Sequence, residues 1–288
     1  MGSLQARVAV VGHVEWVQFA RVAHVPRAGE VVHASDPFEE PAGGGAVAAV
    51  QLARLAGDAM LVTALGDDEH GRRSVARLGS LGVDVRASFE PSPTRTAVTL
   101  VDAAGERTIT TFGPRLEPLG DADSARWDAL GARDAIYVTA GDEGALRAAR
   151  EAARVLVASP RVGDALGHGV RLDALVLSAD DEIELRAAAR ADGDAELVVL
   201  TEGENGGSFR TCAGETGRWA AAEPPAEPVD SYGCGDSFAA GLTYGLGAGL
   251  DLDAALALAA RCGATCLAGR GPYERQLYSP SLAQAKPK

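Results

Sequence analysis

The sequence predicts an α/β protein built on an open, mostly parallel sheet that helices cover on both faces. Strand-like and helix-like segments alternate from residue 135 onward, and several short apolar runs end at glycine turns. Hydrophobic residues make up 47% of the chain, aromatic residues make up 5%, and there are 35 glycines. This combination is typical of strands and helices joined by tight turns, and less so of a β-sandwich. A length of 288 residues predicts a single domain over 1–288.

The first half of the chain predicts two kinds of segment. The run over 7–11 is mostly apolar up to Gly12 and predicts a buried strand. Two runs over 96–101 and 107–112 flank a loop that contains Gly105, which predicts a β-hairpin. The other expected elements are a strand-like segment over 31–34, a helix over 42–55, a strand over 60–65 and a helix that stops at Gly82. The segments around 13–40 and 94–113 interrupt the alternation, and we expect them to form a small β-lid.

The second half predicts the alternation itself. Strands are expected over 135–139, 154–158, 175–178 and 197–201. Helices are expected over 143–153, 181–191, 236–246 and 252–268. Strands separated by helices of this length are typical of parallel pairing, because a parallel connection needs a crossover.

The charge of the chain limits its partners. The net charge is −13, so we expect neither nucleic acid nor an anionic membrane as a partner. No apolar run approaches the ~20 residues that span a bilayer. The four cysteines lack the spacing of a zinc site, which favours a reducing, cytoplasmic location. Cys262 and Cys266 are interpreted as small buried residues, although their spacing of four also suits two ligands of a metal ion.

The most informative stretch runs from Asp230 to Gly241 and reads DSYGCGDSFAAG. Gly233 and Gly235 precede a helix of small residues, so backbone N–H groups converge at a helix N-terminus and form a site for an anion. Asp236 lies in the first turn of that helix. A carboxylate there is unsuited to bind phosphate but suited to take a proton from an attacking hydroxyl. The alternative is that Asp236 is an ordinary first-turn acid that complements the helix dipole.

This segment resembles the signature of the ribokinase-like (PfkB) carbohydrate and nucleoside kinases, which reads Asp-Thr-x-Gly-Ala-Gly-Asp-x-Phe-x-x-Gly. Further segments resemble family landmarks in the same order. They are Pro26 with Gly29-Glu30, the GDDEHG run over 66–71 with LGVD over 81–84, GERT over 105–108, and VVLTEGENG over 198–206. The resemblance covers nearly the whole chain and implies the ribokinase-like fold with a β-lid.

The resemblance also implies roles for named residues. Asp236 matches the catalytic base, and Gly233, Cys234 and Gly235 match the anion hole. Asp230 and the carbonyl of Tyr232 match a site where many members bind a monovalent cation such as K⁺. ATP and Mg²⁺ are the implied cofactors. The predicted nucleotide-binding residues are Thr201, Gly203, Gly206 and Gly263. Cys234 stands at a position that is usually alanine, which favours a small residue over a nucleophile.

Two positions depart from the family pattern. The Asp that follows the first glycine and binds sugar hydroxyls aligns with Val17, and the Asn of Gly-Gly-x-x-x-Asn aligns with Val47. Hydroxyl binding at these positions is therefore lost. Glu15 is a candidate replacement, with a solvated lid residue as the alternative, and His13 is a second candidate. The predicted substrate-binding residues are Glu15, Val17, Gly43, Gly44, Val47 and Arg107, the last with a solvated hairpin arginine as its alternative.

The family's Asn-x-x-Glu motif aligns with Ala179-Asp180-Asp181-Glu182, which predicts Glu182 as the residue that acts on Mg²⁺. We expect an ATP-dependent kinase that phosphorylates a hydroxyl of a sugar, nucleoside or related alcohol, with a homodimer through the lid as a further expectation. The alternative is a catalytically silent relative that binds a ligand. A dinucleotide-dependent enzyme is excluded because the turn after the first strand lacks Gly-x-Gly-x-x-Gly.

Overall fold

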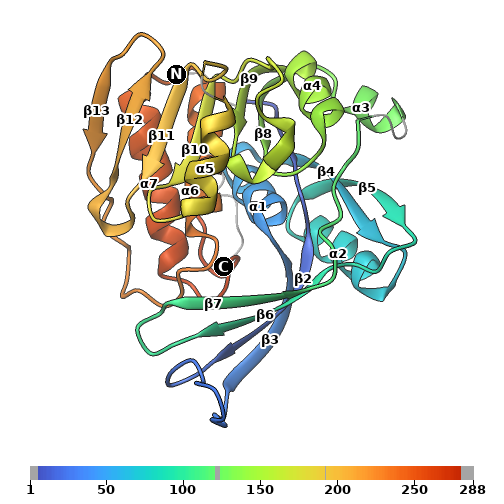
Figure 1. Ribbon diagram of the computed structural model, residues 1–288, viewed down its shortest axis with the longest axis vertical. Helices are drawn as coiled ribbons and strands as arrows, with labels where there is room; N and C mark the ends of the chain where they lie inside the picture. Colours follow the sequence, from blue (N-terminus) through green and yellow to red (C-terminus); the bar gives the residue numbers. More distant parts are fainter. Residues whose placement is uncertain (1–5, 121–123, 192, 280–288) are drawn as a thin grey trace.

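The computed structural model describes residues 6–120, 124–191 and 193–279. These residues form a nine-stranded sheet with the order β13-β12-β11-β10-β9-β8-β1-β4-β5 and a separate four-stranded sheet (Figure 1). The strands from β11 to β5 in this order are parallel, whereas β12 and β13 join the edge of the sheet as antiparallel strands. The strands of the large sheet are β1 Val8–Val11, β4 Ala59–Gly66, β5 Val83–Glu90, β8 Arg133–Val138, β9 Ala153–Ala158, β10 Ala174–Ser178, β11 Leu197–Thr201, β12 Gly207–Thr211 and β13 Thr216–Trp219.

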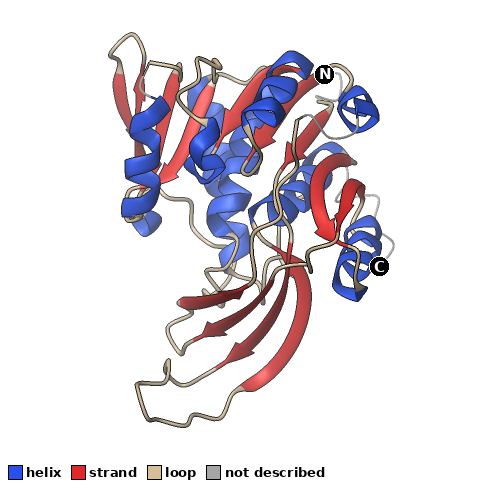
Figure 2. Cartoon of the chain, turned by 45° about the vertical axis from the view of Figure 1, so that its right-hand side comes forward, coloured by secondary structure: helices blue, strands red, loops and turns tan. Residues whose placement is uncertain are grey.

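Helices cover both faces of the large sheet, which confirms the predicted fold class (Figure 2). The alternation along β1 shows why: Val8 and Val10 belong to one apolar core, and Ala9 and Val11 belong to the other. Residues of α1, α6 and α7 fill the first core, and residues of α4 fill the second. The helices are α1 Gly44–Ala56, α2 Glu69–Ser80, α3 Ser124–Leu130, α4 Glu143–Ala152, α5 Glu182–Ala188, α6 Cys234–Gly247 and α7 Leu252–Leu267, with 3₁₀ turns η1 Pro160–Ala165, η2 Ala189–Ala191 and η3 Gly203–Asn205.

The small sheet has the order β3-β2-β6-β7 and lies below the large sheet in Figure 1. Its strands are β2 Glu15–Arg21, β3 Ser35–Ala42, β6 Thr96–Val101 and β7 Arg107–Phe112. Both predicted lid segments therefore belong to one sheet, and β2 pairs with β6 although they are distant in the sequence. Phe19 stacks on Phe38 within the sheet and meets the ring of Tyr232 edge-on at 4.9 Å. The small sheet, which is the predicted lid, thus packs against the loop that precedes α6.

The predicted strand over 31–34 is wrong. Val31 is 84% exposed, and the strand of this segment begins at Ser35, where β3 pairs with β2. A β-branched pair of residues is not sufficient for a strand without a neighbour to pair with. Four elements were not predicted from the sequence, namely β5, β12, β13 and α3. Among the described residues, no helix combines the length and apolar character needed to cross a membrane.

Candidate active site

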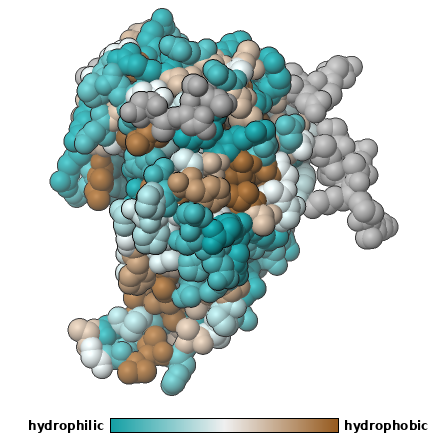
Figure 3. Space-filling view, turned by 90° about the vertical axis from the view of Figure 1, so that its right-hand side faces the viewer, coloured by the Kyte–Doolittle hydropathy of each residue, from teal (hydrophilic) through white to brown (hydrophobic). Residues whose placement is uncertain are grey.

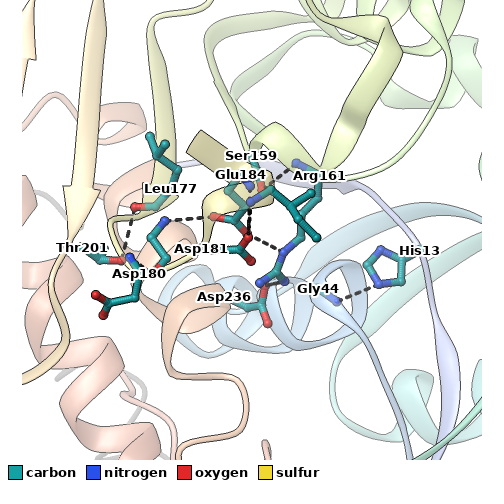
Figure 4. Close-up of polar contacts among 12 residues, drawn as sticks. His13, Gly44, Ser159, Arg161, Leu177, Asp180, Asp181, Glu184, Thr201 and Asp236 are labelled. Atoms are coloured by element: carbon teal, nitrogen blue, oxygen red, sulfur yellow. Dashed lines mark hydrogen bonds and ion pairs between the residues drawn. The ribbon is translucent and has the colours of Figure 1, made fainter. Parts of the chain in front are cut away.

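The carboxyl ends of the parallel strands meet along one edge of the large sheet. His13 follows β1, Thr139 follows β8, Arg161 follows β9, and Thr201 is the last residue of β11. In open α/β sheets ligands bind in the crevice outside these strand ends. Figure 4 shows His13, Arg161 and Thr201 in one neighbourhood around the start of α6. The topology therefore gathers polar residues from four different strand ends.

Helix α6 begins at this edge with its first amides uncapped by any side chain. Gly233, the residue before the helix, has a φ of 82°, which is a left-handed conformation that favours glycine. A Cβ on Gly233 would also lie 2.9 Å from Cγ1 of Val47, so the position excludes a side chain. A Cβ on Gly235 would meet no atom within 4 Å, so the space beside the helix start is open. The N–H of Cys234 makes only a long contact of 3.4 Å with the carbonyl of Ser231. Amides without a side-chain cap, at the positive end of a helix of 14 residues, form a site that attracts an anion.

The carboxylate of Asp236 lies between Arg161 and the start of α1 (Figure 4). Its Oδ1 is 3.4 Å from Nη1 of Arg161. A Cβ on Gly44 would lie 2.9 Å from the same oxygen, so the missing side chain at Gly44 leaves room for the carboxylate. The Asp236 side chain is 15% exposed, which is enough for a ligand to reach it. The sequence-predicted base is therefore neither turned away from the strand ends nor sealed from solvent.

His13 lies buried beside the same glycine. The N–H of Gly44 donates to Nε2 of His13 at 3.4 Å. Burial, and then the neighbouring Arg115, lower the pKa of His13 well below its ordinary value. The imidazole is therefore neutral, and since Nε2 accepts a hydrogen bond, the proton is assigned to Nδ1.

Glu15, the first residue of β2, is buried in the lid and 6% exposed. Its Oε2 lies 3.6 Å from Nε of Arg95. Burial raises the pKa of Glu15, and Arg95 opposes this effect. Glu15 is thus a desolvated carboxyl group whose electrostatics are linked to Asp236 and Arg161, both of which act on its pKa. The alternative of a solvated lid residue does not hold.

Val17 and Val47 are both fully buried, with no exposed surface. They belong to the same apolar core, so neither position offers a polar group to a ligand. Gly43, next to them, has a φ of 87° and donates its N–H to the hydroxyl oxygen of Tyr232 at 3.2 Å. The two glycines Gly43 and Gly44 therefore connect the start of α1 to the loop before α6.

Asp230 holds the loop before α6 in place. One carboxylate oxygen accepts the N–H of Tyr232 at 2.9 Å, and the other accepts the N–H of Gly271 at 3.0 Å. The residue is 2% exposed, and burial raises its pKa. The carbonyl of Tyr232 accepts from the thiol of Cys266 at 3.4 Å. The groups predicted to hold a monovalent cation are therefore already hydrogen-bonded within the protein.

Cys234, the first residue of α6, behaves as a small residue. A hydrogen bond with Cys266, and then burial, raise the pKa of the Cys234 thiol well above its ordinary value. A thiol that stays protonated is a poor nucleophile. Cys262 and Cys266 are also fully buried, as predicted.

The lid hairpin reaches the loop before α6. Nη1 of Arg107 donates to Oγ of Ser231 at 3.1 Å, and the N–H of Ser231 donates to the carbonyl of Gly105 at 3.1 Å. On β2 of the same sheet, Nη1 of Arg21 donates to the carbonyl of Val229 at 3.3 Å. The structure therefore brings Arg107 to the segment that opens α6.

The residues predicted for the nucleotide lie at the end of β11 and beyond it. Oγ1 of Thr201 donates to the carbonyl of Leu177 at 3.3 Å. Gly203 has a φ of 56° and open space where a Cβ would lie, whereas a Cβ on Gly206 would collide with the carbonyl of Trp219. Gly263 lies elsewhere, on α7, where a Cβ would be 3.2 Å from the carbonyl of Cys234. Gly263 thus allows α7 to approach the start of α6 closely.

The chain is similar to known proteins over nearly its whole length. The family model described as "pfkB family carbohydrate kinase" matches residues 5–168 and 171–277. The chain belongs to the PfkB family of carbohydrate kinases. An ATP-dependent ribose-1-phosphate kinase of Halopiger xanaduensis is 33% identical over 279 residues, which cover 90% of each chain. A fructokinase of Klebsiella pneumoniae is 29% identical over 287 residues, covering 85% of this chain and 91% of the fructokinase.

Solved structures agree with the fold. The ribokinase of Arabidopsis thaliana, solved with ribose and ATP, superimposes with a TM-score of 0.74 at 18% identity, covering 98% of this chain and 99% of the ribokinase. The resemblance stated from the sequence motifs is thus confirmed. The protein is a small-molecule kinase of the PfkB family.

In this PfkB kinase the acidic residue that faces the strand ends is Glu184. Glu182, which the sequence alignment predicts, has a side chain that is 81% exposed and pairs with Arg186 on the outside of α5. Glu184 is buried, and its carboxylate accepts from Nε of Arg161 at 2.7 Å and from the N–H of Ser178 at 2.9 Å. Asp181 caps α5 through the N–H groups of its first turn. Asp181 and Glu184 therefore have the same spacing as the Asn and Glu of the family's Asn-x-x-Glu motif. They lie two residues further along the chain than the predicted pair at positions 179 and 182.

Three further polar residues of this kinase were missed by sequence reasoning. Arg161, Arg95 and Arg115 all act on the pKa of His13 and Glu15, so they surround the predicted acceptor side. Arg161 carried a signal in the sequence, because it comes shortly after a predicted parallel strand, where such folds place ligand-binding residues. The positions of Arg95 and Arg115 depend on how the lid docks, and no local pattern reveals that.

Proposed function

We propose that this kinase transfers the γ-phosphate of ATP to a hydroxyl of a sugar or related small polyol, with Asp236 as the general base. The observation that carries this proposal is the arrangement at the start of α6. Amides that no side chain caps stand next to open space, and a carboxylate from the same helical turn stands beside them. Phosphoryl transfer requires both an anion site and a group that accepts the hydroxyl proton. The names of the relatives, a ribose-1-phosphate kinase and a fructokinase, support the same reaction type.

In the proposed mechanism the hydroxyl oxygen attacks the γ-phosphorus in line with the departing ADP. Asp236 accepts the hydroxyl proton, and the amides of Gly233, Cys234 and Gly235 stabilise the charge that develops on the phosphoryl oxygens. The helix dipole of α6 adds to this stabilisation. Since the overall charge of −13 repels ATP at long range, these local groups have to supply the attraction.

The nucleotide is proposed to bind along the ends of β10 and β11. Gly203 supports this, because its open face lets a ligand approach the backbone. Gly206 closes the same turn: its N–H donates to the carbonyl of Gly203 at 3.2 Å. Thr201 ends the strand next to Asp180 (Figure 4). This turn gives the adenosine side of ATP a backbone surface, while the phosphates point to α6.

The residues present fit a Mg²⁺ ion that arrives with ATP. Among the described residues, no three acidic, histidine or cysteine side chains converge on one metal-sized position. Mg²⁺ commonly takes one or two protein carboxylates and completes its shell with phosphates and water. Asp180 and Glu184, which lie between Thr201 and Asp236 in Figure 4, are the carboxylates that would hold it, and when bound it would neutralise phosphate charge. A monovalent cation at Asp230 and the carbonyl of Tyr232 stays a prediction, because an oxygen that accepts one hydrogen bond still has a second lone pair.

The acceptor is proposed to bind on the lid side of Asp236. Glu15 and the neutral His13 are the polar groups that support this, since Val17 and Val47 are buried in the core. Gly43 and Gly44 allow His13 and the carboxylate of Asp236 to lie close against the start of α1. Recognition by Glu15 and His13 would differ from that in relatives with acidic and amide residues at the two valine positions, so the preferred acceptor is expected to differ as well.

Lid closure is proposed to exclude water, because an exposed site would hydrolyse ATP. The contact between Arg107 and Ser231 supports a lid that closes onto the anion site. Apolar side chains gather on the lid in the lower part of Figure 3, and Ile109 and Phe112 of β7 are 42% and 54% exposed. We keep dimerisation through this strand as a prediction that light scattering can test.

A coupled ADP-release assay tests the proposed function. The panel contains D-ribose, ribose 1-phosphate, D-fructose, acarbose and adenosine, each with MgATP. We expect turnover of at least one acceptor and a loss of about 10²–10⁴-fold in kcat for Asp236→Asn. Asp253→Asn is the matched control, because Asp253 is also a first-turn acid, on α7, and is exposed. Equal activity of Asp236→Asn and the native protein would refute the base, and failure to bind ATP or turn over any acceptor would favour a silent ligand-binding protein.

A further inference from the structure

Arg161 lies between the two carboxylates of the site. It belongs to η1, the turn that follows β9, and its guanidinium extends toward α6 (Figure 4). Nε donates to Oε1 of Glu184 at 2.7 Å, and Nη1 is 3.4 Å from Oδ1 of Asp236. No other described side chain joins Glu184 to Asp236 by a hydrogen bond or ion pair. Arg161 is therefore the physical link between the proposed base and the buried acid of α5.

The arginine is held from several sides. Oγ of Ser159 accepts the N–H of Arg161 at 3.2 Å, and Nη2 of Arg115 donates to its carbonyl at 2.9 Å. Burial lowers the pKa of Arg161, but Asp236 and Glu184 outweigh this effect and raise it above its ordinary value. The two carboxylates thus favour the charged guanidinium, and the backbone that carries it is held by Ser159 and Arg115.

One part of the guanidinium has no partner in the protein. Nη2 makes no hydrogen bond to any residue over the described ranges. The Arg161 side chain is 41% exposed, compared with 15% for Asp236. A donor without a protein partner therefore belongs to a side chain that solvent reaches, beside the proposed base. A residue that only neutralised two carboxylates would have no reason to leave this donor open.

Distances relate this donor to the reaction. A hydroxyl that gives its proton to Asp236 must lie about 2.6–3.2 Å from the carboxylate. The phosphorus it attacks lies about 3–3.5 Å from that hydroxyl in a reactive arrangement. A guanidinium that already touches Asp236 is within reach of the oxygens on that phosphorus. Arg161 is the side-chain cation that contacts both Asp236 and Glu184, and it offsets negative charge that would repel the incoming phosphate.

We propose that Arg161 is a catalytic residue that donates hydrogen bonds to the oxygens of the phosphoryl group in transfer. This inference rests on the proposed function. The bond between the acceptor oxygen and the γ-phosphorus forms, the bond between that phosphorus and the bridging oxygen of ADP breaks, and ADP leaves with the electron pair. The acceptor proton goes to Asp236. Arg161 neither gains nor loses a proton, and it shifts its Nη1 and Nη2 donors from Asp236 and solvent to the phosphoryl oxygens, while Glu184 holds Nε.

The test compares Arg161→Ala and Arg161→Lys with the native enzyme, using MgATP and the acceptor of highest kcat/KM in the panel. For Arg161→Ala we expect kcat to fall by about 10³-fold or more, as for other arginines that contact a transferring phosphoryl group, with KM for ATP changed less than about threefold. Added guanidinium chloride at millimolar concentration should restore part of the lost kcat in Arg161→Ala. Arg161→Lys should remain impaired, because an ammonium cannot replace the planar fork.

Arg186→Ala is the matched control, since Arg186 forms an exposed ion pair with Glu182 on the adjacent helix, and it should keep native kinetics. The affinity for ADP, measured with and without aluminium fluoride in the presence of the acceptor, gives a second readout. Arg161→Lys should bind ADP with native affinity, but aluminium fluoride should no longer increase that affinity. The proposal is overturned if kcat of Arg161→Ala stays within threefold of native, if Arg161→Lys restores full kcat, or if guanidinium has no effect on a folded Arg161→Ala. A native protein without any kinase activity would instead refute the proposed function.

Discussion

Replacing Gly44 by alanine is the smallest change that reaches the proposed base. The new Cβ would lie 2.9 Å from Oδ1 of Asp236 and 3.0 Å from Oγ1 of Thr139. Non-bonded heavy atoms prefer separations of about 3.5 Å, so the carboxylate has to retreat by about half an ångström. Gly44 has no positive φ, so the alanine backbone itself is unstrained.

The expected effects on activity and stability have opposite signs. A misplacement of about 1 Å costs about 10²-fold in rate, so half of that shift costs about tenfold, or about 1.4 kcal/mol in the activation barrier. Gly44 is the first residue of α1, where alanine is favoured over glycine by at most about 0.5–1 kcal/mol in free energy of unfolding. This gain offsets the contact penalty, and we expect the free energy of unfolding to stay within about 1 kcal/mol of native.

Steady-state kinetics and urea unfolding of Gly44→Ala measure both effects. Gly79→Ala is the matched control, because Gly79 lies in α2 and a Cβ there meets no atom within 4 Å. The control should be more stable by about 0.5–1 kcal/mol and keep native kcat. Native kcat in Gly44→Ala would refute the reasoning that Gly44 defines the room for Asp236. A large loss of stability would show that the contact is relieved through the backbone of α1 instead.

Three other predictions follow from single contacts. The pKa of His13 is lowered in the folded protein, so below pH 6.5, its ordinary pKa, the unfolded chain binds a proton that the folded chain does not. The free energy of unfolding should therefore fall as the pH drops below 6.5, by up to about 1.4 kcal/mol per pH unit. His13→Asn should show a shallower fall when urea unfolding is measured over a series of pH values. Asp230→Ala leaves two backbone N–H groups unpaired and should lower the free energy of unfolding by about 2–5 kcal/mol. An unchanged urea midpoint would show that Asp230 does not stabilise the loop before α6. Arg107→Gln should reduce kcat/KM by about tenfold through loss of the lid contact, with a thermal midpoint equal to that of Arg86→Gln, an exposed ion-pair control.

Much of the fold could be predicted because it depends on local patterns. The helices α1, α6 and α7 and the strands β4, β6, β7 and β11 lie within a few residues of their predicted bounds. Each has a continuous apolar run or a clear glycine boundary. The antiparallel strands β12 and β13 were missed because they are only five and four residues long and lie at the edge of the sheet. Their inward-facing residues, such as Phe209 and Trp219, are only partly buried, so the apolar pattern is too short to recognise. Edge strands depend on their neighbours, which a single sequence does not display.

The candidate site divides in the same way. Gly233 and Asp236 could be predicted because the roles proposed for them depend on backbone conformation and helix position, which leave glycines at fixed spacing. To choose between Glu182 and Glu184, one has to know at which residue α5 begins. Asp181 caps α5, so the side chain of Glu184 points inward and that of Glu182 points outward. A shift of two residues on a helix moves a side chain through about half a turn. Residue type alone could not decide between two acids in one turn.

The contrast between the two halves of the site explains where specificity can change. The proposed phosphate side consists of amides and glycines, which accept few substitutions because the left-handed backbone at Gly233 and the contact with Val47 exclude a side chain. The proposed acceptor side consists of side chains from the small sheet and from strand ends, such as Glu15 and His13, and these can be exchanged without disturbing the backbone. Valines at positions 17 and 47 are compatible with the fold because both lie in a continuous apolar core. A kinase can therefore keep its phosphoryl-transfer apparatus while the residues that select the alcohol vary, and for this reason the sequence identifies the reaction more readily than the acceptor.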